Sequence, residues 1–462
     1  MLTLDRQISL EGLMSHRSSP QSDSVSTPQP VPPAQLSEAD RKAAQDTLIS
    51  LIHDRIFHAD DPKTNESYNI GIISTILHDC NVSPTFASPL PKDNAMTPLH
   101  LAASASDTEL ITLLLRYNAL VNIHDESGQT PLHLASPTDD HPTIEALLLP
   151  LASHPESPAN RANAPNSAGH SVLFLHATGH INAPQTFQHL LTLGPEVINH
   201  LSSDPELPTA LWAATARGDL DLAQALLAAG ADPTIRAKDE STLLHKVNWP
   251  RMTKLHTMLL EHGADPSARD EMGREPLHCA ATTGQPRICE TLLNVVDSQG
   301  RGVDVNSVDN QKRTALMNAA EAGHLRLVYL LVVKYKAHVG PKDEFGHDAF
   351  MLACSGGFVD IAAFLLGKQD GRDLDDTDEK ELSALHVSVA LGHVDVVRFL
   401  VELGASKRGI ELEDIGALVE DGVDVDKGNE IREILGMERV SIGLGDTEGR
   451  RRGSGLRRYI TV

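Results

Sequence analysis

Residues 95–107 read AMTPLHLAASASD, and the word TPLHLA inside them returns in GQTPLHLAS at residues 128–136. The threonines that begin the two copies, Thr97 and Thr130, are 33 residues apart. A word that recurs at such a distance indicates a structural unit that is used more than once along the chain.

Seven weaker copies follow, of which SVLFLHA is the faintest and TALWAA, EPLHCAA and TALMNAA are clearer. They begin at Ser171, Thr209, Thr242, Glu275, Thr314, Asp348 and Ser383. Successive starts of the nine copies are 33, 41, 38, 33, 33, 39, 34 and 35 residues apart. These spacings predict one unit, with insertions, repeated over residues 96–406.

Most units carry a second apolar pattern after the first, such as ITLLL at Ile111 and VVRFLV at Val396. Apolar residues at i, i+3 and i+4 place a leucine ridge on one side of a helix. One pair of helices cannot bury both of its ridges, so neighbouring pairs must stack. Left-handed glycines are expected between the paired helices at Gly218, Gly284, Gly323, Gly356 and Gly392, and second helices should end at Gly230, Gly263 and Gly404.

At several junctions between units, an aspartate stands five residues before the next start. These residues are Asp125, Asp270, Asp309, Asp343 and Asp378. In three units the pattern D-x-x-G is completed by Gly128, Gly273 and Gly346, which is typical of a type I turn. Each such turn predicts a projecting hairpin tip.

The repeated TPLHLA, together with AGADP and HGADP after second helices, resembles the ankyrin repeat family. The resemblance implies an all-α ankyrin-repeat solenoid of stacked helix-turn-helix units with projecting β-hairpin tips, with about nine repeats, some degenerate. In that family the motif histidine joins a hydrogen-bond network between repeats. This implies the same structural role for His100, His133, His245, His278 and His386.

The second and third units depart from the pattern. Pro137 interrupts a first helix, and Asp139 occupies the place of the turn glycine. A proline-rich insertion, LASHPESPANRANAPNSAG, then follows. Whether the array is continuous through residues 136–208 stays open at this point.

The rest of the chain divides by composition. Residues 1–35 are rich in Ser, Pro and Gln and are expected to be disordered. Residues 36–95 predict a helical N-terminal extension or cap of the array. Its first helix is expected to begin after the N-cap residue Ser37, with Asp40 as the capping-box partner. Residues 407–440 predict an acidic C-terminal cap, and residues 441–462 a basic flexible tail.

Charge and cysteine content limit the function. A net charge of −24 disfavours direct nucleic-acid or membrane binding, and the four cysteines form no CxxC pair. No secretory signal or membrane span is recognisable, so we expect a monomeric intracellular protein, cytoplasmic or nuclear. HExxH, GxSxG and P-loop motifs are absent from the sequence, so we expect no catalytic, cofactor-binding or metal-binding residues, no cofactor and no enzyme activity.

A solenoid instead offers a long concave face of tips and first helices for protein partners. The tip side chains that the corner motif leaves free are Glu126, Met272, Arg274, Phe345 and His347, and Trp249 is a further candidate anchor. The favoured hypothesis is a non-catalytic scaffold, adaptor or regulator. The alternatives are a nuclear transcription coregulator, with the arginines of residues 449–462 as an import signal, and a subunit of an enzyme complex.

Overall fold

The computed structural model describes residues 37–57, 66–79, 82–88, 95–149, 157–179, 183–246, 252–295, 302–369, 373–410 and 425–437. It divides the chain into two compact units, residues 1–86 and 87–462. The described residues are mostly helical and form no β-strand; isolated antiparallel bridges join Val308 with Thr314 and Thr377 with Ser383. No helix among them is long and apolar enough to cross a bilayer.

The first unit contains the helices α2 (Glu38–Phe57) and α3 (Glu66–Asp79), which pack against each other. The side chain of Ser37 accepts a hydrogen bond from the backbone N–H of Asp40 and donates one to its carboxylate, at 3.2 and 2.6 Å. This is the helix start that the sequence predicted.

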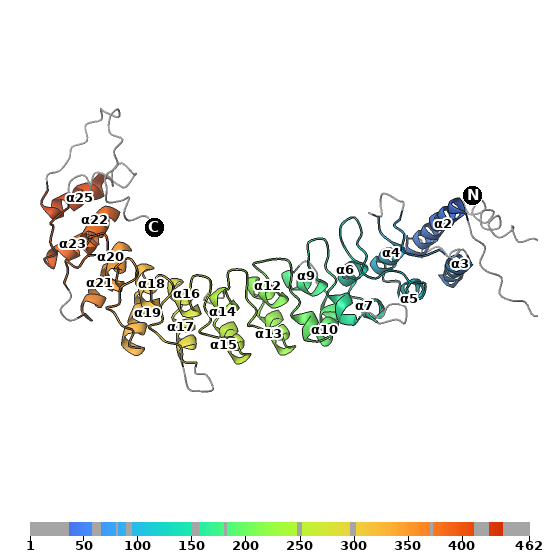
Figure 1. Cartoon of the computed structure of the whole chain (residues 1–462), viewed down its shortest axis with the longest axis horizontal. Helices are drawn as coiled ribbons and strands as arrows, with labels where there is room; N and C mark the ends of the chain where they lie inside the picture. The colour runs from blue at the N-terminus through green and yellow to red at the C-terminus, as the bar shows by residue number, and fades with distance from the viewer. Residues whose placement is uncertain are drawn as a thin grey trace, which may run out of the picture. The chain divides into compact units, whose positions relative to one another are not determined.

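The described part of the second unit holds nine pairs of short helices, which Figure 1 shows in single file. The pairs are α4 (Pro98–Ser104) with α5 (Thr108–Arg116), α6 (Pro131–Ala135) with α7 (His141–Leu148), α9 (Val172–Thr178) with α10 (Pro184–Thr192), α12 (Ala210–Ala216) with α13 (Leu220–Ala228), α14 (Leu243–Lys246) with α15 (Thr253–Glu261), α16 (Pro276–Thr282) with α17 (Pro286–Leu293), α18 (Ala315–Glu321) with α19 (Leu325–Tyr329), α20 (Ala349–Ser355) with α21 (Val359–Leu366), and α22 (Ala384–Leu391) with α23 (Val394–Glu402). First helices pack on first helices, as α16, α18 and α20 do, and second helices on second helices, as α19, α21 and α23 do.

The corner word starts each first helix. Thr97 has extended backbone angles, Pro98 supplies the first helical residue, and the Thr97 hydroxyl bonds the His100 ring. Behind the corner, Leu99 and Ala102 are fully buried. Each buried leucine contributes about 2 kcal/mol of hydrophobic free energy, which is why the units stack instead of standing alone.

The turn glycines have positive φ at Gly218, Gly284, Gly323 and Gly392, as predicted. The prediction for Gly356 is wrong: its φ is −78°, and Gly357 is the left-handed residue, at +82°. The reason is that two glycines follow α20: Gly356 is the C-cap, and the residue after the C-cap takes the left-handed conformation.

The irregular region is a continuous part of the array. Asp139 takes the left-handed conformation of the missing glycine, and its carboxylate accepts hydrogen bonds from the backbone N–H groups of Gln185 and Thr186, at 3.1 and 2.7 Å, which caps α10. Pro137 lies in a 3-10 turn, η2 (Ser136–Thr138), that replaces the last turn of α6. The irregular region also contains two short extra helices, α8 (Pro158–Ala162) and α11 (Pro195–Ile198), which pack against each other.

The described array ends in α25 (Val425–Leu435), which packs on α23. Arg398 and Glu430 form an ion pair at 2.5 Å between these helices, and the Lys407 ammonium donates to the last carbonyls of α25, those of Ile434 and Leu435. The predicted disordered N-terminus and basic tail, and residues 411–424 and 438–440 of the predicted acidic cap, lie outside the described residues.

Candidate protein-binding surface

The corner histidines hydrogen-bond within and between units. The backbone N–H of Thr97 donates to Nδ1 of His100 at 3.1 Å, so the proton of the neutral ring is on Nε2. That Nε2 lies 3.1 Å from the carbonyl oxygen of Gln129 in the next tip. His133, His245 and His278 reach the carbonyls of His170, Arg274 and Ser307 in the same way, at 3.0, 2.9 and 3.1 Å. His386 bonds Ser383 through Nδ1 at 2.7 Å, in the ninth unit.

Burial keeps the rings of His100, His133, His245 and His278 uncharged. Desolvation lowers the pKa of His100, His245 and His278 below the usual histidine value, and that of His133 to about 4. A neutral ring is the form that accepts on Nδ1 and donates from Nε2. These histidines therefore have the chemistry of structural links between units, and not that of acid–base catalysts.

Five tips are closed by the aspartate that stands five residues before the next start. The Oδ1 atom of Asp343 accepts hydrogen bonds from the backbone N–H groups of Phe345 and His347, at 3.0 and 2.8 Å. Asp270, Asp309 and Asp378 bond the equivalent N–H groups of their own tips. The five aspartates that the sequence singled out are all buried.

Backbone hydrogen bonds also join successive tips. The N–H of Asn310 donates to the carbonyl of Met272 at 3.1 Å, and that of Glu379 to the carbonyl of Phe345 at 3.0 Å. Equivalent bonds join the remaining described tips: Ser167 to Gly128, Ser203 to Gly169, Lys238 to Pro205, Glu271 to Asp239 and Glu344 to Gln311. The tips therefore form one braced row, with side chains projecting from fixed positions.

Two of the predicted binding residues are exposed. Met272 is 52% exposed at its tip. Glu126 is exposed on the tip of the second unit. Met272 is thus the exposed apolar member of the predicted set.

The guanidinium of Arg274 is partly engaged in an ion pair within its own tip. Its guanidinium lies 2.8 Å from the carboxylate of Asp270, and Nε donates to the same oxygen at 2.9 Å. In the preceding unit, Lys246 and Asp239 form a second ion pair at 2.8 Å. Arg274 therefore reaches a partner only with the donors that Asp270 leaves free.

Phe345 and His347 lie together, with ring centroids 6.1 Å apart, and both are half-buried. His347 contacts Asp343 in its own tip and Asp378 in the next one. The hydrogen bond to Asp343 outweighs burial and raises the pKa of His347. Trp249, the remaining candidate, lies outside the described residues.

A second set of hydrogen bonds between units was not predicted from the sequence. His324 and His393 follow turn glycines, and their Nε2 atoms lie 3.0 and 2.7 Å from the carbonyls of Thr282 and Ser355 in the preceding units. The signal was present, since both histidines occupy the same place in their units. Their role became visible only once the units were stacked.

The cysteines are poor nucleophiles. Burial raises the pKa of the Cys279 thiol to about 11 and that of Cys289 to about 12, and it also raises the pKa of Cys354. The reactive thiolate is therefore scarce at neutral pH. Cys80 lies outside the described residues.

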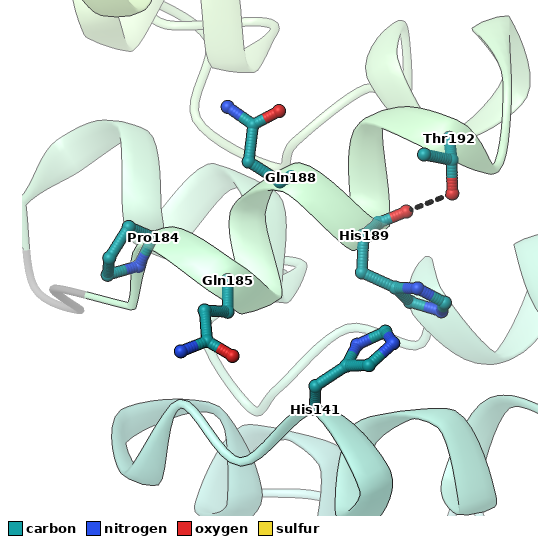
Figure 2. A pocket seen from close by; sticks show the side chains of 6 residues that line it. All are labelled: His141, Pro184, Gln185, Gln188, His189 and Thr192. Atoms are coloured by element: carbon teal, nitrogen blue, oxygen red, sulfur yellow. Dashed lines mark hydrogen bonds between the residues drawn. The ribbon is translucent and has the colours of Figure 1, made fainter.

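A shallow, open depression lies between α7 and α10, lined by His141, Gln185, Gln188 and His189 among others (Figure 2). The two histidine rings meet edge to face, with centroids 4.8 Å apart. Zinc sites in proteins use three or four protein ligands. Within the described part of the chain, no group of three or more His, Cys, Asp or Glu side chains could hold a metal ion.

Comparison with known proteins agrees with this architecture. The family model described as ankyrin repeats matches residues 66–158, 243–343 and 328–409, and the model of a single ankyrin repeat matches residues 209–238.

Three similar proteins illustrate the range of relatives. An ankyrin repeat and KH domain-containing protein, mask-1, of Caenorhabditis elegans is 29% identical over 35% of this chain and 6% of its own length. Human ankyrin repeat domain-containing protein 63 is 33% identical over 29% of this chain and 34% of its own. The transient receptor potential cation channel subfamily A member 1 of Drosophila melanogaster is 25% identical over 46% of this chain and 18% of its own. The matched part is thus at most about a third of each of these relatives.

Proposed function

Because the chain belongs to the ankyrin repeat family, we propose that it is a non-catalytic protein that binds partner proteins as a scaffold, adaptor or regulator. The proposed contact surface is the row of tips together with the first helices. Ankyrin repeats form protein-interaction domains, and the finer role is the proposal.

The observation that carries the proposal is the braced row of tips. Each described tip is closed by side-chain or backbone bonds and is tied to its neighbour by a backbone hydrogen bond. A surface that is already ordered loses little conformational entropy when a partner docks, so contacts spread over several tips can sum to a specific affinity. Met272 supplies an exposed apolar contact on this row.

The test is affinity capture with a triple variant, in which Met272, Phe345 and Trp249 are replaced by alanine. We expect the variant to lose partner proteins that the parent captures, while its helical circular dichroism is unchanged. Thr257→Ala serves as the matched control, because Thr257 is exposed on a second helix, α15, away from the tips. Equal capture by the triple variant and the parent would remove these anchors from the surface.

The coregulator alternative depends on the arginines of residues 449–462, which lie outside the described residues. A fluorescent fusion that lacks this segment tests it. The alternative requires the truncated fusion to leave the nucleus.

A further inference from the structure

One second-helix position is exposed or half-buried in eight of the nine units, and only one of these units places an aromatic residue there; in the third unit, Thr186 at this spacing is buried. The position lies fifteen residues after the start of the unit, directly after a buried residue. In seven units other than that of Tyr329 it holds a polar or small residue: Thr112, Glu145, Gln224, Thr257, Glu290, Ala363 and Arg398. Tyr329 is 55% exposed at this position, so the core does not require its ring.

Tyr329 is part of an apolar cluster on the second helices. Leu325, one turn earlier in α19, is 41% exposed. The Tyr329 ring lies against that of Phe364 in α21, with centroids 5.5 Å apart, and the ammonium of Lys368 lies 5.8 Å from the Phe364 centroid. We call Leu325, Tyr329, Phe364 and Lys368 the Tyr329 patch.

The backbone is unusual at the same place. The residues that follow Tyr329 form a π-helical turn, η3 (Leu330–Lys334), where the N–H of Tyr335 bonds the carbonyl of Leu330 at 3.3 Å. π-Helical turns are rare and occur frequently at functional sites. This turn is followed by Tyr335, which is held by a 3.0 Å hydrogen bond from its hydroxyl to Asn294. The irregular turn directly adjoins the Tyr329 patch.

The charge around the patch is opposite to that of the chain. The segments 325–336 and 359–368 together carry the bases Arg326, Lys334, Lys336 and Lys368 and the single acid Asp360. Of these bases, Lys334 is paired with Glu290 at 2.7 Å. Against a net charge of −24, a local excess of bases beside the exposed ring of Tyr329 and the half-buried ring of Phe364 favours an acidic ligand.

We propose that the Tyr329 patch is a second docking site, separate from the tips, for an acidic peptide segment of a partner protein that carries one large apolar side chain. The apolar side chain packs against Tyr329 and Phe364. The carboxylates pair with Lys368 and Arg326. Tyrosine is enriched among the residues that dominate interface affinity, and a ring already held by Phe364 loses little freedom on binding.

The experiment is selection from a randomised peptide library displayed on phage, with the full chain as bait. We expect recovered peptides to be rich in Asp and Glu and to share one aromatic or large aliphatic residue. Their affinity, measured by fluorescence anisotropy, should fall by about thirtyfold or more in Tyr329→Ala. It should also fall in Lys368→Glu and with rising salt.

Thr257→Ala is the matched control, because Thr257 is the counterpart of Tyr329 in the fifth unit. Met272→Ala, on the tips, should leave this binding unchanged, so that failure here and failure of the tip surface are distinguishable. Recovery of no peptide whose binding depends on Tyr329 would overturn the proposal. The proposal would also be overturned if peptides were recovered only when the bait carries amides in place of the carboxylates of Glu411, Glu413 and Asp414. In that case the chain's own acidic segment, and not a partner, would occupy the Tyr329 patch.

Discussion

The Nε2 atom of His347 lies 3.3 Å from a carboxylate oxygen of Asp378, across the junction between two neighbouring tips. The Nδ1 atom of the same ring lies 3.5 Å from Asp343 in its own tip. One protonated imidazole thus joins two acidic tips, whereas a neutral one can donate to only one of them.

His347 should therefore stabilise the array more at mildly acidic than at basic pH. Its pKa in the folded protein is above the ordinary 6.5, so its contribution is complete below that value and is lost as the pH rises through the folded pKa. We expect His347→Gln to lower the free energy of unfolding by about 1 kcal/mol near pH 6 and by less near pH 9. Urea unfolding followed by circular dichroism measures both values. An equal difference at the two pH values would contradict the prediction.

His133 should have the opposite pH dependence. Its pKa falls from 6.5 to about 4 on folding, so its contribution is present above 6.5 and is lost as the pH falls toward 4. The shift corresponds to roughly 3 kcal/mol. We expect the difference in unfolding free energy between the parent and His133→Gln to shrink over this range. The same urea titrations at several pH values check this, and a difference that grew on acidification would show that the folded ring is readily protonated.

Introducing a glycine at one tip and replacing the glycine at the matching place of the next tip should have opposite effects on stability. Lys312 is exposed and has a φ of +61°, so Lys312→Gly should raise the unfolding free energy by up to about 1 kcal/mol by relieving a left-handed conformation. Gly346 occupies the matching place in the next tip, and a Cβ there would lie 2.9 Å from the backbone nitrogen of Glu379. Gly346→Ala should therefore destabilise the array. Thermal unfolding of the two variants and the parent measures both effects. Midpoints that shift in the same direction would contradict the prediction.

His256 is a polar side chain at a core position that is aliphatic in several other units. It is fully buried in α15; its Nδ1 atom makes a long hydrogen bond, 3.3 Å, to the carbonyl of Met252, and its Nε2 atom has no hydrogen-bond partner among the described residues. Units with regular cores place Ile111, Ile144, Val328 or Val397 at the same position. We expect His256→Val to raise the unfolding free energy by about 1 kcal/mol, because an unpaired buried polar atom is removed. Denaturant unfolding measures the change, and a loss of stability would show that the ring has a partner that the described residues do not reveal.

The sequence was sufficient for most of the architecture. The helix pairs, the capping threonines and the buried tip aspartates follow from patterns within one unit, which depend on helix periodicity and turn chemistry alone. The error at Gly356 is of the same local kind, since two adjacent glycines leave open which one follows the C-cap. Among the candidate binding residues, the tip position of Met272 was predictable from the D-x-x-G pattern, but its exposure was not, since Phe345 has the matching place in its own tip and is half-buried.

Contacts between units were not predictable from the same patterns. The link from His324 to the carbonyl of Thr282, the bridge from His347 to Asp378 and the pairing of Tyr329 with Phe364 each join residues more than thirty positions apart. Periodicity determined which face of each helix is buried, because that depends on the order of apolar side chains. The rotation and spacing of one unit on the next determined which exposed side chains meet, because those distances exist only after the ridges have packed.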